Sequence, residues 1–77
     1  MIKYEDKIEI NSKKMMGKPV IKGTRITVEL ILEELSKGKK PEELINAYPG
    51  LDLNGIYAAL AFASDSIKGE KTYPIAI

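Results

Sequence analysis

The side chains that could carry out chemistry in this chain are carboxylates, lysines, tyrosines and hydroxyls, because the sequence contains neither histidine nor cysteine. This composition excludes imidazole bases, thiol nucleophiles, disulfides and zinc sites of the Cys/His type. The acid pairs Glu33–Glu34 and Glu42–Glu43 are adjacent in sequence, and adjacent side chains on a helix point in diverging directions. We therefore expect no enzymatic activity, no cofactor, no bound metal ion and no small-molecule substrate.

A second kind of chemistry, the binding of phosphate groups, is indicated by a segment that carries cations but no acid between Glu9 and Glu29. Its cations are Lys13, Lys14, Lys18, Lys22 and Arg25. Lysine and arginine on a hairpin can hold the phosphates of DNA, and we assign this candidate role to Lys18, Lys22 and Arg25. Lysines that only keep a loop solvated explain the segment equally well. Since the net charge is +1, any attraction to nucleic acid must be local.

Short strands are expected to position these cations. Ile8 and Ile10 alternate with charged residues, which predicts a short, half-buried strand. The β-branched stretch PVIKGTRITV predicts a small hairpin around Gly23, because glycine readily takes the positive φ that a tight turn needs. Between the two, the Met15–Met16 pair is interpreted as flexible filling of the core.

Three helices are expected to follow between residues 28 and 68. Their predicted starts and stops are Thr27 and Gly38, Pro41 and Pro49, and Asp52 and Gly69. The predicted buried stripe of the third helix comprises Leu53, Ile56, Leu60, Ala63 and Ile67, which recur three and four residues apart. The fold class is therefore mainly α with a small N-terminal β-hairpin. We expect residues 1–77 to form a single domain, with strands and the basic hairpin in 1–27, the helices in 28–68 and a tail in 69–77.

The second and third expected helices, joined by about four residues, have the order of a helix-turn-helix, whose second helix can enter the DNA major groove. In that arrangement Asn54 and Tyr57 face outward. Asparagine can pair with adenine and tyrosine can contact phosphate. Three-helix domains that bind no DNA are common, and the third helix carries no arginine. A dimeric protein-interaction module without DNA binding is therefore the alternative.

Apolar residues beyond the predicted core indicate an interface, most simply with a second copy of the chain. They are Tyr57, Ala58, Ala61 and Phe62 on the third helix and Tyr73, Ile75 and Ile77 in the tail. Small alanines let another helix approach closely, and an extended apolar tail can add a strand to the sheet of a partner. Both sets can instead be covered within the domain, by the N-terminal strands and by a tail that folds back.

The sequence contains no apolar run near the roughly 18 residues that a membrane-spanning helix needs. Its first ten residues, MIKYEDKIEI, carry acids where a signal peptide would be apolar. We therefore expect a cytoplasmic protein without membrane association.

Four stretches of the chain, GKPVIKGTRITV, ELILEELSKG, PEELINAYPGL and IYAALAFA, resemble a known family. They cover roughly residues 17–63 and are similar to the domain-of-unknown-function family 433 of short bacterial and archaeal proteins. The resemblance implies a homeodomain-like or winged helix-turn-helix fold. It also implies an antitoxin that represses its own operon by binding operator DNA and that blocks a PIN-like ribonuclease toxin.

The residues that carry the hairpin motif of that family are Gly17, Lys18, Pro19, Gly23, Thr24 and Arg25, and its turn and packing residues are Tyr48, Pro49 and Leu51. By this resemblance, Arg25 either ties the hairpin to an acidic helix residue, which we favour, or contacts phosphate. The chain departs from the family at Asn54 and Gly55, where acids are usual, and at Tyr57, where a basic residue is frequent. Losing the acids favours contact with phosphate, whereas losing the basic residue removes a donor.

Overall fold

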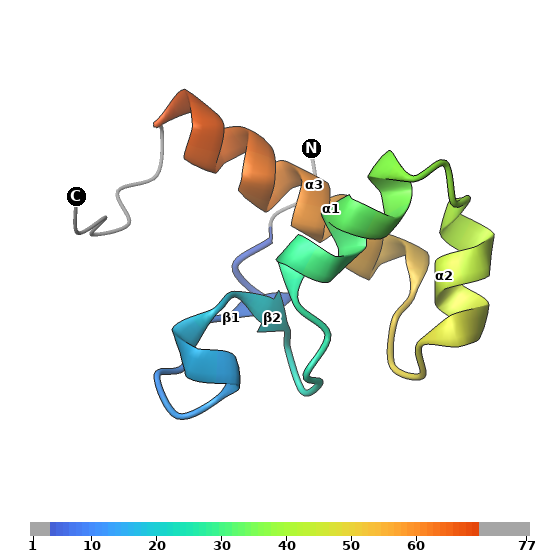
Figure 1. Cartoon of the computed structure of the whole chain (residues 1–77). Coiled ribbons are helices and arrows are strands. Elements are labelled where there is room, and N and C mark those ends of the chain that lie inside the picture. Colours follow the sequence, from blue (N-terminus) through green and yellow to red (C-terminus); the bar gives the residue numbers. More distant parts are fainter. Residues whose placement is uncertain (1–3, 70–77) are drawn as a thin grey trace.

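The computed structural model describes residues 4–69, which form three helices and a two-stranded sheet. In chain order the elements are β1 (Ile8–Glu9), η1 (Met15–Gly17), β2 (Val20–Ile21), α1 (Val28–Ser36), α2 (Pro41–Ala47) and α3 (Leu53–Lys68). Figure 1 shows the sheet and its loops below α1 and α3, with α2 at one end and the last turns of α3 extending beyond the other elements. The predicted class, mainly helical with a small N-terminal hairpin, is confirmed.

The sheet is short, and a turn separates it from α1. Its antiparallel register pairs Ile8 with Ile21 and Glu9 with Val20. The turn predicted around Gly23 is present: the Ile21 N–H donates to the Ile26 carbonyl at 2.8 Å, and Val20 forms a single antiparallel bridge with Thr27. The segment after β2 therefore folds back along it before α1 begins.

The predicted helix starts are confirmed by their capping hydrogen bonds. The Thr27 hydroxyl accepts the Leu30 N–H at 3.0 Å at the start of α1. The Asp52 carboxylate accepts the Gly55 N–H at 2.8 Å at the start of α3. These side chains satisfy N–H groups that have no partner within the first helical turn. Pro41 begins α2, at the position where its missing N–H costs nothing.

The core collects apolar side chains from the N-terminal segment, the sheet and all three helices. Its buried members are Tyr4, Ile8, Ile21, Ile26, Val28, Ile31, Leu44, Leu51, Ile56, Ala58, Ala59 and Phe62. The rings of Tyr4 and Phe62 meet edge to face, with centroids 5.4 Å apart and an interplanar angle of 78°. The segment before β1 therefore covers one side of α3, while α1 packs against another.

The buried face of α3 differs from the predicted stripe. Leu53, Leu60 and Ile67 are 43%, 42% and 87% exposed, so of the large residues in that stripe only Ile56 lies in the core. The face that is buried consists of Gly55, Ile56, Ala58, Ala59 and Phe62. The helix is apolar on two sides, and the side with the smaller residues lets α1 and the N-terminal segment approach closely. The prediction from periodicity chose the wrong side of α3 because it followed the large apolar side chains, whereas the buried side is rich in glycine and alanine.

Two loop predictions are also wrong. Met15 is 37% exposed and Met16 is 92% exposed, so the pair does not fill the core. Both residues have positive φ angles, 50° and 58°, and lie in the short η1 turn. None of the residues of η1 is buried. Ile10, which follows the end of β1 at Glu9, is 50% exposed and so does not continue the buried side of that strand.

Candidate binding surfaces

The first of two tight turns that shape the candidate site spans residues 21–24. The Thr24 N–H donates to the Ile21 carbonyl at 3.0 Å, and Gly23 has the positive φ of 78° that a type II turn requires at its third position. The Thr24 hydroxyl also donates to the Ile21 carbonyl at 2.8 Å and accepts the Ile26 N–H at 3.0 Å. This hydroxyl therefore closes the turn on both sides and fixes the rotamer of its own side chain.

The second turn spans residues 48–51, between α2 and α3. The Leu51 N–H donates to the Tyr48 carbonyl at 3.1 Å. Pro49 occupies the second position and Gly50, with φ of 93°, the third, which is the residue pattern of a type II turn. The conformation of this turn thus explains the proline and glycine of the motif YPGL. The turn sets the direction of α3 relative to α2.

These two turns contact each other beside the start of α3. A Cβ atom on Gly50 would lie 3.0 Å from the Cγ2 of Thr24, so a side chain there would require Thr24 to shift by a few tenths of an ångström. A Cβ atom on Gly55 would lie 3.2 Å from Leu51 and 3.7 Å from Ile21, so the first turn of α3 packs against both turns. We call residues 21–25 and 48–55 the turn junction. The fold thereby joins two sequence motifs that are separated by two helices.

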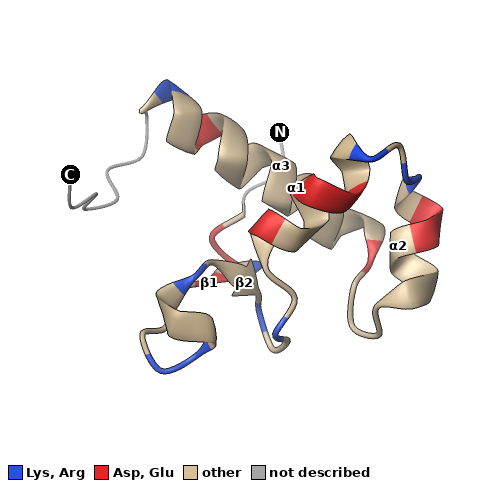
Figure 2. Cartoon of the chain, in the orientation of Figure 1, with Lys and Arg blue, Asp and Glu red and all other residues tan. Residues whose placement is uncertain are grey.

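Two of the three predicted phosphate-binding cations belong to the turn junction. Lys22 and Arg25 are exposed and form no ion pair with any carboxylate of residues 4–69. The expected tie between Arg25 and an acidic helix residue is therefore not made within that range. The first acid of α1, Glu29, instead binds Lys18 at 2.9 Å. Figure 2 shows Lys and Arg on the loops around the sheet and on the connection between α1 and α2, and acids along α1 and α2.

The tip of the first turn is also held by Glu9 on β1. Its Oε1 accepts the Lys14 Nζ at 3.3 Å and the Gly23 N–H at 3.4 Å. The hydrogen bond from Lys14, followed by that from the Gly23 N–H, lowers the pKa of Glu9 below its ordinary value. This carboxylate therefore connects the segment before η1 to the turn that carries Lys22 and precedes Arg25.

The predicted DNA-reading residues Asn54 and Tyr57 are exposed in the first turns of α3, and Asn54 belongs to the turn junction. Tyr57 lies instead on what we call the outer face of α3. This face comprises Leu53, Tyr57, Leu60, Ser64 and Ile67, all exposed and spaced alternately four and three residues apart. It carries no charged side chain, and only Ser64 and the Tyr57 hydroxyl can hydrogen-bond. Such a face offers few groups for reading base edges.

The structure changes the membership of the predicted partner interface. Ala58 is fully buried in the core, and Phe62 is 8% exposed and packs against Tyr4, so neither is available to a partner. Ala61 is partly buried and packs against the core, whereas Tyr57 remains exposed. The tail residues Tyr73, Ile75 and Ile77 lie outside the described residues.

The exposed leucines and isoleucine of the outer face were missed as surface residues. A signal for them exists in the sequence: Leu53, Tyr57, Leu60 and Ile67 share one side of a 3.6-residue helix, opposite Ala58, Ala59 and Phe62. Two apolar sides on one helix predict one buried face and one interface, but do not say which is which.

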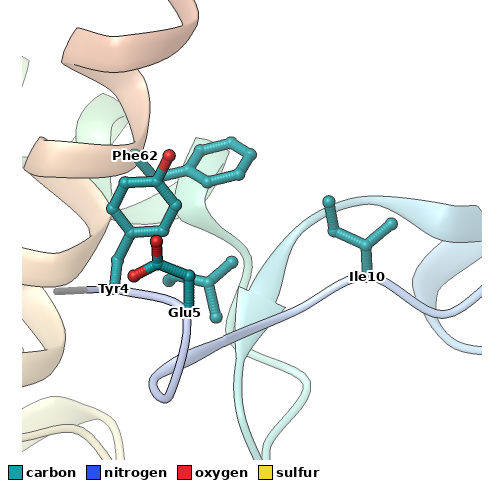
Figure 3. Close-up of a pocket in the computed structure, with 5 residues that line it drawn as sticks. Tyr4, Glu5, Ile10 and Phe62 are labelled. Carbon is teal, nitrogen blue, oxygen red and sulfur yellow. The ribbon is translucent and has the colours of Figure 1, made fainter. Parts of the chain in front are cut away.

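Two hollows border α3, and Phe62 lines both of them. One, of about 230 Å³, is lined by Tyr4, Glu5, Ile8, Ile10 and Phe62; Figure 3 shows the rings of Tyr4 and Phe62 pointing toward each other and Ile10 apart from them. Its lining includes a single carboxylate. The other is an apolar groove of about 300 Å³ between α1 and the last turns of α3, lined in part by Leu32, Ala63 and Ile67. The apolar surface of the outer face thus continues into this groove.

Within residues 4–69, no three acidic side chains come together in a way that could hold a metal ion. No helix in the same range is long and apolar enough to cross a membrane.

Comparison with known proteins identifies a family but no activity. A family model described as "Protein of unknown function (DUF433)" matches residues 8–63. A solved structure described as the crystal structure of a DUF433 member protein from Anabaena variabilis ATCC 29413 is similar, with a TM-score of 0.77 and 26% sequence identity. The alignment covers 84% of this chain and 64% of that one, so the chain spans less than two thirds of that relative. No curated protein matches the chain.

Proposed function

The chain belongs to the DUF433 family, whose description assigns no activity, so we propose its function from its surfaces. We propose that it is a protein-interaction module, not an enzyme, and that it binds a partner through the outer face of α3. The observation that carries this proposal is the exposure of four large apolar side chains on one side of a helix. They are Leu53, Tyr57, Leu60 and Ile67.

The energetics favour association through this face. Fully burying a large apolar side chain contributes roughly 1.5–3 kcal/mol, so completing the burial of a half-exposed leucine contributes on the order of 1 kcal/mol. Exposed apolar side chains that are contiguous, unlike scattered ones, mark interaction sites. Leu53, Tyr57 and Leu60 are each about half exposed on consecutive turns, which satisfies that condition.

In the finer form of this proposal the chain is an antitoxin and the partner is a PIN-like ribonuclease toxin, as the family resemblance implies. Co-expression with the product of the neighbouring reading frame tests it. A variant with Tyr57→Glu and Leu60→Glu is expected to lose the complex, because two buried carboxylates would have no partner charge. A matched variant with Lys22→Glu and Arg25→Glu is expected to keep it.

The outcomes separate the general proposal from its finer form. A complex that survives the two substitutions on the outer face would show that this face is not the binding surface. A wild-type chain that forms no complex with that product would contradict the toxin as its partner.

DNA binding is a second candidate function, supported by the position of Lys22 and Arg25. Both are free of ion pairs within residues 4–69 and lie in the turn junction with Asn54, at the start of α3. Cations and helix N-termini contact phosphates, whereas the outer face lacks donors for bases. We therefore propose contact mainly with the DNA backbone, in the autorepressor role that the resemblance implies.

Fluorescence anisotropy across a salt series tests this candidate, with DNA from upstream of the gene and a scrambled duplex. Lys22→Ala and Arg25→Ala are each expected to reduce the slope of log affinity against log salt by about 1. Lys39→Ala is the control, since Lys39 is already bound to Glu34 at 3.4 Å. If neither substitution changes the slope, the turn junction does not contact DNA phosphates. A preference for upstream DNA that Asn54→Ala abolishes would show that this asparagine reads a base.

A further inference from the structure

We propose that the outer face of α3 binds a second copy of this chain, with the two α3 helices antiparallel and crossing at Leu60. This inference rests on the proposed function, because it names the occupant of the same surface. It also goes further, because it fixes the direction and register of the contact.

The spacing of the outer face is nearly symmetric about Leu60: the outer positions lie seven residues away on both sides and the inner ones three and four. Leu53 precedes Leu60 by seven residues and Ile67 follows it by seven, while Tyr57 precedes it by three and Ser64 follows by four. In an antiparallel pair the contacts are therefore Leu60 with Leu60, Leu53 with Ile67, and Tyr57 with Ser64. Alternate spacings of four and three residues are those of helices that pack along their length.

The paired side chains also fit in size and charge. Tyr57, the largest side chain of the face, lies opposite Ser64, the smallest, so the ring has room against the other helix. The face carries no charge, so two copies bring no like charges together. Antiparallel helices place opposite ends of their dipoles side by side. A net charge of +1 per chain adds little long-range repulsion between copies.

The position of α3 leaves this face accessible to a second molecule. The last turns of the helix extend beyond α1 and α2 in Figure 1. Ile67 at that end also borders the apolar groove that Leu32 and Ala63 line. In the proposed register, Leu53 of one copy meets Ile67 of the other at the edge of this groove. The contact thus extends beyond a single line of side chains.

The expected association is reversible and depends on concentration. A helix of 16 residues is about 24 Å long at 1.5 Å per residue. We expect one helix pair of that length to bury less than the roughly 1,200–2,000 Å² of a standard stable interface. The dimer is therefore expected to dissociate on dilution, and measurements must cover a concentration series.

Single-cysteine variants test the register directly, because the chain contains no cysteine. In the proposed pair, the two Leu60→Cys residues meet and oxidation links them into a covalent dimer. The two Ser64→Cys residues lie about 12 Å apart along the axis at 1.5 Å per residue. That separation exceeds the roughly 7 Å limit between Cα atoms for a disulfide, so this variant is expected to lose nearly all of the cross-linked product.

A mixture of two further variants checks the ends of the contact. Leu53→Cys and Ile67→Cys proteins are expected to link to each other, but neither to itself, since identical positions lie about 21 Å apart along the axis at 1.5 Å per residue. Ser36→Cys, exposed at the end of α1, is the control for random collisions. Equal linking at positions 60 and 64 would indicate parallel helices and overturn the register. Linking of the Ser36→Cys control at the same yield, or no linking at all, would overturn the dimer.

Leu60→Glu separates this inference from the proposed function. Its helical circular dichroism is expected to match the wild type, because Leu60 contributes little to the core, while sedimentation shows loss of the dimer. If the wild type stays monomeric at every concentration but its complex with the neighbouring gene product still requires Tyr57 and Leu60, self-pairing is wrong and the proposed function stands. If Leu60→Cys cross-links as described but substitutions at Tyr57 and Leu60 leave the complex with the neighbouring gene product intact, the self-pairing stands. The proposed binding of a partner through the outer face is then wrong.

Discussion

The turn junction and the outer face of α3 start at the same end of one helix, yet their conformations are fixed in different ways. Glycine at positive φ, the Thr24 hydroxyl and the Glu9 carboxylate hold the junction within the chain. The outer face is shaped by helix formation, and within residues 4–69 its apolar side chains stay partly uncovered, with Leu53 and Leu60 just over 40% exposed and Ile67 87% exposed. Substitutions in the junction should therefore change folding, whereas those on the outer face should change association.

The largest expected effect contrasts the two sides of α3. Phe62→Ala is expected to lower the free energy of unfolding by about 3–5 kcal/mol, because it removes a buried ring and its edge-to-face contact with Tyr4. Leu60→Ala, at low protein concentration, is expected to lower it by less than about 1 kcal/mol, since surface substitutions rarely exceed that. Urea unfolding of dilute protein measures both. Equal losses would mean that Leu60 packs within one chain, and the distinction between the faces would fail.

A smaller effect is expected at the contact between the two turns. Gly50→Ala and Gly23→Ala each force a non-glycine residue to a positive φ, at a cost of about 1–3 kcal/mol. Only at Gly50 does the new Cβ also meet Thr24, at 3.0 Å, while at Gly23 it meets open space. Gly50→Ala is therefore expected to lower the free energy of unfolding more than Gly23→Ala does, as thermal or urea unfolding would show.

The variant Thr24→Ser isolates the steric part of that cost. Serine keeps the hydroxyl that closes the turn but lacks the Cγ2 atom that Gly50→Ala would meet. In the double variant, the loss caused by Gly50→Ala is expected to fall to the level seen for Gly23→Ala. If Thr24→Ser rescues nothing, the two turns do not restrict each other as described.

The sequence predicted the parts of the fold that depend on neighbouring residues. Thr27 and Asp52 were identified as caps because a cap and the N–H groups that it satisfies lie within three residues of each other. The turn at Gly23 was identified because the requirement for positive φ is local. Such features need no knowledge of what packs against them.

The largest features that sequence reasoning missed depend on residues far apart in the chain. The side of α3 that is buried is decided by Tyr4 and α1, which cover Ala58 and Phe62 and leave Leu60 exposed. The contact between Thr24 and Gly50 joins two motifs that the sequence shows separately. Neither arrangement follows from spacing, since periodicity describes a helix and not its neighbours.

The smallest expected effect concerns the carboxylate that ties β1 to the first turn. Because Lys14 and the Gly23 N–H lower the pKa of Glu9 in the folded chain, the unfolded chain binds a proton there more readily. The resulting stabilisation is present above the ordinary carboxyl pKa and is lost as the pH falls through the lowered pKa of the folded state. The free-energy difference between the wild type and Glu9→Gln should therefore shrink on acidification.

Urea unfolding of both proteins from neutral to acid pH measures this difference, with Glu42→Gln as the control at an exposed position of α2 that forms no ion pair within residues 4–69. Added salt should reduce the difference further, because the Lys14–Glu9 pair is reached by solvent. A difference between wild type and Glu9→Gln that is the same at every pH would mean that the charge of Glu9 does not hold the turn. The junction would then depend on its glycines and on the Thr24 hydroxyl alone.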